Sequence, residues 1–338
     1  MMHAPIAQPS RPGRRPALPA RRMLALALGA AACAGAHAGD DYPSHAITIV
    51  SPFAAGGTGD IVARLTAKAL YAELKQSVIV ENRAGAGGVV GASFVAKSRP
   101  DGYTLIMHTT SSAVLNGLLH KNLPYDAKND FIPVGLIGTQ PEILLTSGAT
   151  PAADIKSFIA LAKKNGPLNF GSSGVGGIMH LSSVHFATAA GIDAVHIPYR
   201  GESEAINSLI SGQTQFQSGS LVSTMPLIKQ GALRVLCIMS TKRSDMIPDT
   251  PTCPEAGLPS LLSTNWHALF APKGTPADVV AKLSDAVARV TRNAGFSDQI
   301  TKLGFSVQTM SSDQLATYRD EEIERWKAVV QAARLEAQ

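Results

Sequence analysis

Short strand-like runs that alternate with amphipathic helices are the feature that most limits the folds open to this 338-residue chain. Strands separated by helices of about 10 to 15 residues indicate βαβ units, in which neighbouring strands run parallel. We therefore predict an α/β fold with a mostly parallel sheet. The first series consists of strands at 46–52, 78–82 and 103–108 and helices at 60–74 and 88–97.

A second series of the same kind follows, and prolines separate it from the end of the chain. The length is sufficient for two domains, so two α/β series with proline-rich joints predict two lobes. The second series consists of helices at 154–164, 177–190, 203–210 and 224–230 and strands at 168–171, 194–198, 214–217 and 233–239. Beyond Pro248, Pro251, Pro254 and Pro259 we expect a strand at 266–271 and helices from Pro276 and over 311–333.

The first 38 residues have the composition of a secretory leader. Five arginines precede the apolar run 23–32, and Ala36-His37-Ala38 has the small-x-small pattern that signal peptidase reads. The apolar run is too short for a membrane span, which needs about 20 residues. We expect cleavage after Ala38 and export to the periplasm. Cys33 follows a poor lipoprotein box, so soluble and lipid-anchored forms both stay open.

Removal of the leader leaves a chain without net charge. The whole sequence has 30 basic and 25 acidic residues, and the leader holds five arginines and no acid, so 25 basic residues remain against 25 acidic ones. A nucleic-acid partner would need a clustered basic face. We therefore expect no nucleic acid among the partners.

Two cysteines remain after the leader, Cys237 and Cys253. They can pair in an oxidising compartment. Cys237 lies in a strand-like run, however, where a buried free thiol behaves as a small hydrophobe, and we favour free thiols over a disulfide. The sequence has no CxxC motif and no cluster of cysteine and histidine, so we expect no metal.

Three glycine-rich stretches, at 54–59, 83–88 and 171–177, each join a predicted strand to a predicted helix. Such loops lie at the carboxyl end of a parallel sheet, and their backbone N–H groups lie at the positive end of a helix dipole. They favour an anion such as a phosphate or a carboxylate. None has the GK[ST] ending of a P-loop or the GxGxxG spacing, so we expect no nucleotide and no other cofactor.

Ser172 and Ser173 raise the alternative of a secreted hydrolase. The G-x-S-x-G spacing of a nucleophile elbow is missing, and no HExxH motif occurs. We assign His185 and His196 to packing or surface roles, and we expect His180, in the first turn after the third loop, to brace that loop. The chain is therefore not expected to be an enzyme, and hydrolysis of an ester or amide is the alternative to test.

Many short motifs are spread over essentially the whole mature chain. They include Ile49-Val50-Ser51-Pro52-Phe53, Gly56-Gly57-Thr58-Gly59-Asp60, Val80-Glu81-Asn82-Arg83, Pro100-Asp101-Gly102-Tyr103, Leu123-Pro124-Tyr125-Asp126, His196-Ile197-Pro198-Tyr199 and Ala271-Pro272-Lys273-Gly274-Thr275-Pro276. In sequence and in order these motifs resemble the Bug family, the periplasmic solute receptors of tripartite tricarboxylate transporters.

The resemblance implies a type II periplasmic-binding fold, in which two α/β lobes close on a ligand in a cleft like a Venus flytrap. The first lobe would comprise 39–140 and 265–338, and the second lobe would comprise 141–264. The implied function is that of a non-catalytic, monomeric receptor that delivers a small organic acid to the membrane permease subunits of a tripartite transporter. An alternative partner is a sensor kinase that recognises the closed receptor.

The resemblance also implies that backbone amides of two loops, 54–60 and 172–177, hold a ligand carboxylate. Glycines let the backbone approach the ligand, and hydroxyl groups add donors. Asp60 is expected to stabilise its turn, because a carboxylate aimed at an anion would repel it. The expected ligand-binding residues are Ala54, Ala55, Gly56, Gly57, Thr58, Gly59, Thr109, Thr110, Ser111, Ser172, Ser173, Gly174, Gly176, Tyr199, Gln217 and Ser218.

The far end of the pocket would decide which acid binds. By the resemblance it draws on 109–111, Tyr199, Arg200 and 215–220. Family members often carry Asp where this chain has Gln215 and Gly219, which weakens the case for a ligand with an ammonium group. We therefore predict a neutral-bodied carboxylate, such as a di- or tricarboxylic, hydroxy or aromatic acid, rather than an amino acid.

Overall fold

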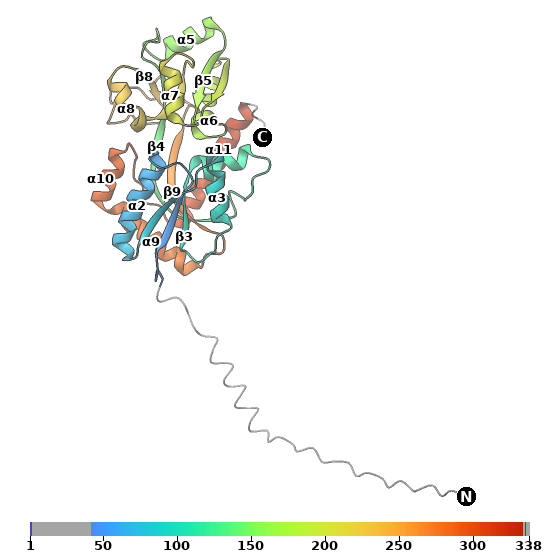
Figure 1. The fold of residues 1–338 in the computed structure, drawn as a ribbon. Coiled ribbons are helices and arrows are strands. Elements are labelled where there is room, and N and C mark those ends of the chain that lie inside the picture. The colour runs from blue at the N-terminus through green and yellow to red at the C-terminus, as the bar shows by residue number, and fades with distance from the viewer. Residues whose placement is uncertain (2–41, 334, 336–338) are drawn as a thin grey trace. The chain divides into compact units, whose positions relative to one another are not determined.

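The computed structural model describes Met1, residues 42–333 and residue 335 (Figure 1). The described residues from Pro43 onward belong to one compact unit. Apart from Met1, the predicted leader with its cleavage point after Ala38 and Cys33 lies outside the described residues. None of the helices described is both long enough and apolar enough to pass through a lipid bilayer.

Three parallel strands begin the fold, as predicted. β1 (Ile47–Ser51) pairs with β2 (Val78–Asn82) on one side and with β3 (Thr104–Thr109) on the other. The connections are α2 (Thr58–Leu74), which follows β1, and the turn η1 (Ala86–Gly88) with α3 (Val89–Ala96), which follow β2. Because the strands point the same way, the loops that follow β1 and β3 lie at one edge of the sheet.

Two antiparallel strands continue this sheet, so the prediction of a mostly parallel sheet is wrong. β9 (Thr264–Pro272) runs antiparallel to β3, and β4 (Phe131–Ser147) runs antiparallel to β9 as far as Pro141. The seven-stranded sheet has the order β2-β1-β3-β9-β4-β7, where β7 is Gln217–Ser220, and β8 (Leu233–Ile238) also pairs with β4. The sequence analysis missed β4 because Pro133, Pro141 and two glycines interrupt its apolar pattern.

The rest of β4 belongs to a second set of strands. Beyond Pro141 it pairs antiparallel with β7 (Gln217–Ser220) and β8 (Leu233–Ile238). β5 (Leu168–Ser172) and β6 (Ala194–Pro198) form a parallel pair, which a bridge between Phe170 and Phe216 links to β7. We call β1, β2, β3, β9 and residues 131–141 of β4 the first strand group, and β5, β6, β7, β8 and residues 142–147 of β4 the second strand group.

Helices cover the strands of both groups (Figure 1). Around the first strand group, α2, α9 and α10 lie on one side and α3 and α11 on the other. The sequence analysis missed α10 and the π-helical turn η2. The remaining bounds are η2 (Ser111–Leu115), α4 (Asn116–Leu119), α5 (Ile155–Asn165), α6 (Ile178–Ala190), α7 (Glu202–Ile210), α8 (Leu221–Lys229), α9 (Ala277–Arg292), α10 (Ala294–Lys302) and α11 (Ser312–Ala332).

The hydrophobic core is divided in the same way as the strands. One cluster contains Trp266, Phe270 and Trp326 and packs against the first strand group, although the start of α6 also contributes to it. The second strand group has two clusters of its own, one around Phe158 and Phe216 and a smaller one that includes Ile143, Leu209 and Leu221. The clusters thus follow the two strand groups, and α6 contributes to the core of both.

The observed β7 and α8 differ from the predicted elements. Residues 214–217 were expected to form the strand, but β7 begins at Gln217 because the preceding residues form a turn. In that turn Thr214 bonds to Ser208, and the Gln215 side chain accepts from the Asn169 N–H and donates to the Gly212 carbonyl. α8 begins at Leu221 instead of residue 224.

Cys237 and Cys253 form a disulfide, so the preference for free thiols is wrong. Cys237 lies in β8, and both cysteines are fully buried. A bridge between Ile238 and Thr252 brings the end of the irregular, proline-containing segment back to β8. That return sets the second cysteine beside the first, which spacing along the sequence did not reveal.

Candidate functional site

The first glycine-rich loop, 54–59, connects β1 to the start of α2. Gly57 is the N-cap of α2 and makes no side-chain capping bond. The first N–H groups of a helix have no acceptor within it, so those of α2 are available at the positive end of its dipole. Gly56 has φ of 82°, a conformation that a side chain would strain. The loop therefore presents backbone donors and no lysine or arginine.

Asp60 fixes this loop, as the sequence predicted. Its carboxylate accepts hydrogen bonds from the Gly56 N–H at 2.9 Å, from Arg64 at 3.0 Å and from Asn82 at 2.9 Å. Burial by itself raises the pKa of Asp60, but the bonds from Arg64, Gly56 and Asn82 outweigh it and lower that pKa. The carboxylate stays ionised and is directed at its own loop.

The loop 172–177, from the third glycine-rich stretch of the sequence, connects β5 to α6. We call it the second loop of the candidate site. Gly177 is the N-cap of α6 and also lacks a side-chain capping bond. Gly176 has φ of 81°, which again requires glycine. Ser111 of η2 reaches this loop from the first strand group, and its Oγ accepts from the Ile178 N–H at 3.1 Å. Ser111, a predicted ligand-binding residue, is therefore in direct contact with the first turn of α6, which follows the predicted loop 172–177.

Two histidines, His180 and His196, and Ser172 hold the second loop in place. The Gly176 N–H donates to His180 Nδ1 at 3.1 Å, which confirms that His180 braces the loop. His196 Nε2 lies 2.7 Å from Ser172 Oγ, and the two imidazole rings stack with centroids 3.8 Å apart. Burial, together with the neighbouring His196, lowers the pKa of His180 to about 3, and burial lowers that of His196 to about 4. Both rings are neutral at neutral pH.

The pair formed by Ser172 and His196 has the separation of a nucleophile and its base, but its surroundings differ. Ser172 is fully buried, and its hydroxyl also bonds to the Gly174 carbonyl at 2.7 Å and accepts from the Gly174 N–H at 3.2 Å. Among the described residues no carboxylate hydrogen-bonds to His196 to orient it as a base. The Ser172 hydroxyl is therefore engaged within its own loop.

Buried polar atoms without a protein partner occur at the strand ends beside the two loops. They include Ser51 Oγ at the end of β1, Thr109 Oγ1 at the end of β3, His267 Nδ1 and both amide atoms of Gln217 at the start of β7. Thr109 and His267 are directly opposite each other in the sheet. Such groups cost free energy unless they find a partner, and a polar ligand at this edge would supply one.

Sequence reasoning missed His267, which lies against the first loop. A Cβ at Gly59 would be 3.6 Å from His267 Nε2. Burial lowers the pKa of His267 to about 4, so its ring is neutral and offers one donor and one acceptor. No motif marks this histidine, and only the antiparallel pairing of β9 with β3 could have placed it beside α2.

The other predicted residues differ in what their side chains contact. Thr110 connects β3 to β9, because its hydroxyl donates to the Thr264 carbonyl and accepts from the Trp266 N–H. Ser218 donates to Glu142 at 2.8 Å. Tyr199 lies beside Gly171, whereas Arg200 is exposed. Of the predicted side chains, Thr109 and Gln217 are the two that are buried with unpaired polar atoms.

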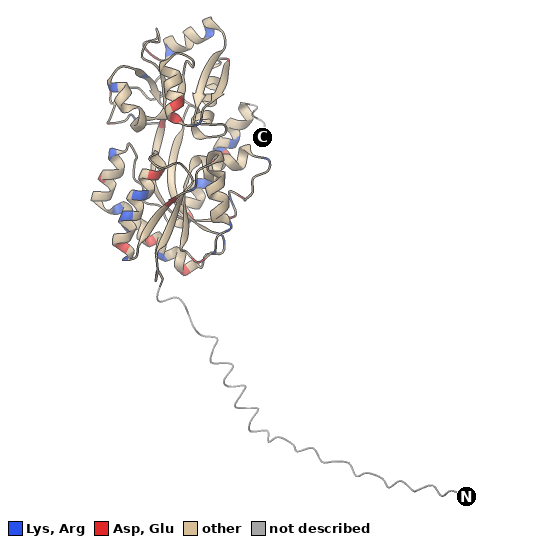
Figure 2. Ribbon diagram, in the orientation of Figure 1, with Lys and Arg blue, Asp and Glu red and all other residues tan. Residues whose placement is uncertain are grey.

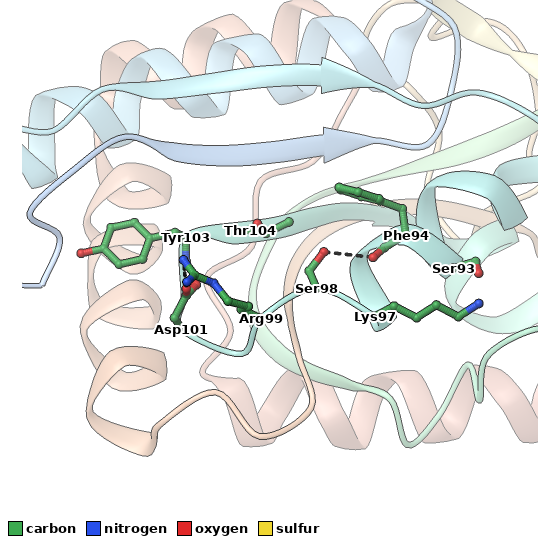
Figure 3. A pocket seen from close by; sticks show the side chains of 8 residues that line it. All are labelled: Ser93, Phe94, Lys97, Ser98, Arg99, Asp101, Tyr103 and Thr104. Carbon is green, nitrogen blue, oxygen red and sulfur yellow. Dashed lines mark hydrogen bonds and ion pairs between the residues drawn. The ribbon is translucent and has the colours of Figure 1, made fainter.

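A hollow of about 590 Å³ lies elsewhere, where α3 turns into β3 (Figure 3). Polar groups in its lining already have partners: Arg99 forms an ion pair with Asp101, and the Ser98 hydroxyl donates to the Phe94 carbonyl. No unpaired buried polar atom belongs to its lining among the described residues. Because the buried polar atoms identify the strand ends, we place the candidate site there and not in this hollow.

Lysine and arginine, and aspartate and glutamate, occur on helices around both strand groups (Figure 2). The two loops themselves contain no lysine or arginine. Any anion they hold would be bound by neutral donors and helix dipoles.

Comparison with known proteins identifies relatives along nearly the whole chain. The tripartite tricarboxylate transporter family receptor profile matches residues 62–335. The protein BugT of Bordetella pertussis is 32% identical over 310 residues, which cover 91% of this chain and 95% of BugT.

Solved structures show the same fold. The periplasmic binding protein BugD is 31% identical, with a TM-score of 0.80 over 88% of this chain and all of that chain (100%). A Rhodopseudomonas palustris protein solved with adipate is 31% identical, with a TM-score of 0.82 over 88% of this chain and 99% of that chain. MatC from the same organism, solved with malate, is 33% identical, with a TM-score of 0.78 over 86% of this chain and 100% of that chain. The fold is thus that of periplasmic binding proteins.

Proposed function

Because this chain belongs to the tripartite tricarboxylate transporter receptor family, we propose that it is a periplasmic receptor for one small organic carboxylate. The carboxylate binds between the loops 54–59 and 172–177. The ligand is a di- or tricarboxylic, hydroxy or aromatic acid. Structural relatives solved with adipate and malate support this class of ligand.

The observation that carries the proposal is the group of unpaired polar atoms buried beside the N-termini of α2 and α6, whose glycine N-caps make no capping bond. The Ile178 N–H is bonded to Ser111, so the later N–H groups of the first turn of α6 are the donors that remain. Oriented amides satisfy the lone pairs of a carboxylate without the desolvation cost of burying a lysine or arginine. Thr109, Gln217 and neutral His267 supply further donors and acceptors. A carboxylate that enters this edge would replace unpaired groups with hydrogen bonds on both sides.

The receptor role requires two parts that close on the ligand. We assign residues 39–140 with 265–338 to one lobe and 141–264 to the other, with β4 and β9 as the connecting strands. Closure makes the loaded form different from the empty form, which lets membrane permease subunits of a tripartite transporter distinguish them. Cleavage of the leader after Ala38 would release the receptor as a monomer into the periplasm.

The test is a thermal-shift screen of the chain purified from the periplasm, against a panel of organic acids and amino acids at fixed pH. A ligand that binds only the folded form adds about 2.7 kcal/mol at a hundred times its dissociation constant, so the melting temperature rises. We expect a shift with one class of carboxylate, confirmed by titration calorimetry with one ligand per chain. Absence of any shift, together with no co-purified acid by mass spectrometry, would refute the receptor proposal.

The short contact between Ser172 and His196 makes hydrolysis the second candidate. A hydrolase would turn over small esters and lose that activity in Ser172→Ala. The receptor proposal expects no product from wild type or variant, and weaker carboxylate binding in the variant because the loop loses its internal bonds. Product formation that stops in Ser172→Ala would favour the hydrolase.

A further inference from the structure

The Glu202 carboxylate, which comes from another element, lies beside Gly219 of β7, next to the point where a side chain at position 219 would begin. A Cβ at position 219 would be 3.4 Å from Glu202 Oε1 and 3.1 Å from Leu145 Cδ1. Glu202 is the first residue of α7. Position 219 itself has no acid, as the sequence shows, but the fold brings the acid of Glu202 to that point.

Glu202 already occupies the anion position at the start of α8. Its Oε1 accepts from the Ser220 N–H at 3.2 Å and from the Ser223 hydroxyl at 2.7 Å. Ser220 is the N-cap of α8 and makes no capping bond with its own side chain. Negative charge at a helix N-terminus is stabilised by the dipole, and here the protein supplies that charge itself. No described residue donates to Oε2.

Gln217 provides a second observation, independent of the helix terminus. Its side chain is fully buried, and neither amide atom has a partner. Gln217 and Gly219 are two apart in β7 and so share a face of the strand. On that face a Cβ at Gly171 would be 3.1 Å from Gln217 Oε1. An unpaired donor and acceptor therefore lie on the same side as the Glu202 carboxylate.

This group of residues adjoins the second loop. Gly171 is followed directly by Ser172, where the loop begins, and the Gly171 N–H donates to the Phe216 carbonyl beside Gln217. The Tyr199 N–H donates to the Ser172 carbonyl, and α7 starts three residues later. Figure 2 shows acidic residues at the end of α7 that lies toward β4.

A second acid is buried in this region, and burial raises the pKa of both acids. Glu142 of β4 is 3% exposed and accepts from Ser218. Burial, and to a smaller extent the nearby Glu202, raise the pKa of Glu142 to about 7, against the hydrogen bond from Ser218. None of the ion pairs found in the described part of the chain includes Glu142 or Glu202. Neither acid is neutralised by a cation.

We propose that Glu202 and Gln217 form a subsite that accepts the hydroxyl or ammonium group of a monocarboxylate and rejects a second carboxylate. This narrows the proposed class of ligand by disfavouring its di- and tricarboxylic members, and it replaces the sequence-based preference against an ammonium group. The inference rests on the proposed function, because the loops must hold the ligand's carboxylate for its other end to reach this subsite. A hydroxyl or ammonium donates to Glu202 Oε2 and pairs with the Gln217 amide. A second carboxylate meets like charge at the helix N-terminus that would otherwise bind it.

The test is titration calorimetry of the full chain with acids of equal length and different ends. Each set contains the dicarboxylate, the terminal hydroxy acid, the terminal amino acid and the plain monoacid, for example glutarate, 5-hydroxypentanoate, 5-aminopentanoate and pentanoate, over three to six carbons. We expect the hydroxy or amino acid to bind at least about tenfold tighter than the dicarboxylate of its length, which corresponds to about 1.4 kcal/mol. The two donor-ended acids reveal which group the subsite prefers.

Glu202→Gln is the decisive variant, because its amide oxygen can still accept from Ser220 and Ser223. In this variant the preference over the dicarboxylate should fall by about tenfold. Glu204→Gln is the control: it removes one charge from the same helix at an exposed position, and it should leave the preference unchanged.

A wild-type preference for the dicarboxylate would overturn the inference, even if Glu202→Gln fails to fold, and so would a preference that Glu202→Gln leaves within twofold. In either case the receptor proposal would stand, since carboxylates still bind. Failure of every acid to bind would refute both proposals.

Discussion

The two loops of the candidate site both end at a glycine N-cap, but different kinds of side chain hold them in place. The first loop is fixed by an ionised network in which Asp60 accepts from Gly56, Arg64 and Asn82. The second is fixed by neutral groups, with His180 accepting from Gly176 and His196 stacked on His180. In the proposed site both loops aim backbone amides at an anion. Charged groups hold the first loop for this role, and neutral imidazoles hold the second.

This difference predicts different responses to acid. Asp60 has a lowered pKa, so its contribution is complete above about pH 3.8 and is lost only as the pH falls further. His180 has a pKa lowered from 6.5 to about 3, so its contribution is complete above 6.5 and declines as the pH falls from there toward 3. Between pH 6.5 and 4 the free energy of unfolding therefore loses part of the contribution of His180 and keeps that of Asp60.

The strand groups differ too, because the second contains a disulfide and the described part of the first contains none. Replacing both Cys237 and Cys253 by Ala should lower the free energy of unfolding by about 3 kcal/mol, since the bond closes a segment of 16 residues. Urea unfolding measures this loss, and wild type treated with a reductant is the control. A loss below about 1 kcal/mol would show that the proline-containing segment is held without the bond.

Glu142 gives the second strand group a pH dependence of opposite sign to that of His180. Its folded-state pKa of about 7 exceeds the ordinary 4.5, so its contribution is complete below about pH 4.5 and is lost as the pH rises through 7. Glu142→Gln keeps an acceptor for Ser218 and cannot ionise. Relative to wild type, the variant should gain on the order of 2 kcal/mol between pH 5 and pH 8.

Thermal unfolding at both pH values, with Glu204→Gln as the exposed control, measures this gain. A difference between Glu142→Gln and wild type that does not change with pH would mean that Glu142 is already ionised in the folded protein at pH 5.

His180→Ala should damage the second loop alone. It removes the acceptor for the Gly176 N–H, and we expect ligand affinity to fall about tenfold, or roughly 1.4 kcal/mol. His180→Asn is the matched control, because its side-chain oxygen can accept the same bond but does not titrate. Because a pKa of about 3 keeps His180 neutral in the folded protein, wild-type affinity by calorimetry should be the same at pH 7 and pH 5, whereas the free energy of unfolding should decline over this range in wild type and less in His180→Asn. Equal affinities in all three proteins would refute the bracing role.

Asp60→Asn should have the smallest effect. The amide oxygen can still accept from Gly56, but the amide nitrogen cannot accept from Asn82, and the charge that attracts Arg64, whose side chain is 54% exposed, is lost. We expect a loss of about 1 kcal/mol or less in stability, and a smaller change in affinity than His180→Ala causes. Thermal unfolding at low and high salt measures it. A larger loss of affinity than that of His180→Ala would reverse the ranking of the two loops.

Much of the fold could be predicted because its elements carry local signals. Val78 to Asn82 was predicted with its observed bounds, and Asp154 caps α5 as expected. β4 carried no such signal, because its prolines and glycines mark the places where it bends and changes partners at register shifts. The antiparallel half of the sheet therefore could not be deduced.

The candidate site shows the same limit. Loops 54–59 and 172–177 are visible in the sequence because glycine before a helix has a local meaning. His267 and Glu202 are not, since one is brought to the site by strand pairing and the other by the packing of α7 against β7. The roles of Ser172 and Thr110 were also hidden, because their hydroxyls are used within the protein.

The central claim is tested most directly by a crystal structure of the receptor loaded with the best carboxylate from the screen. The account predicts that the ligand carboxylate lies within hydrogen-bond distance of backbone N–H groups from both loops, 54–59 and 172–177, with Thr109 or His267 beside it. A carboxylate bound instead at Lys97 and Arg99 in the hollow of Figure 3, or in contact with neither loop, would contradict it.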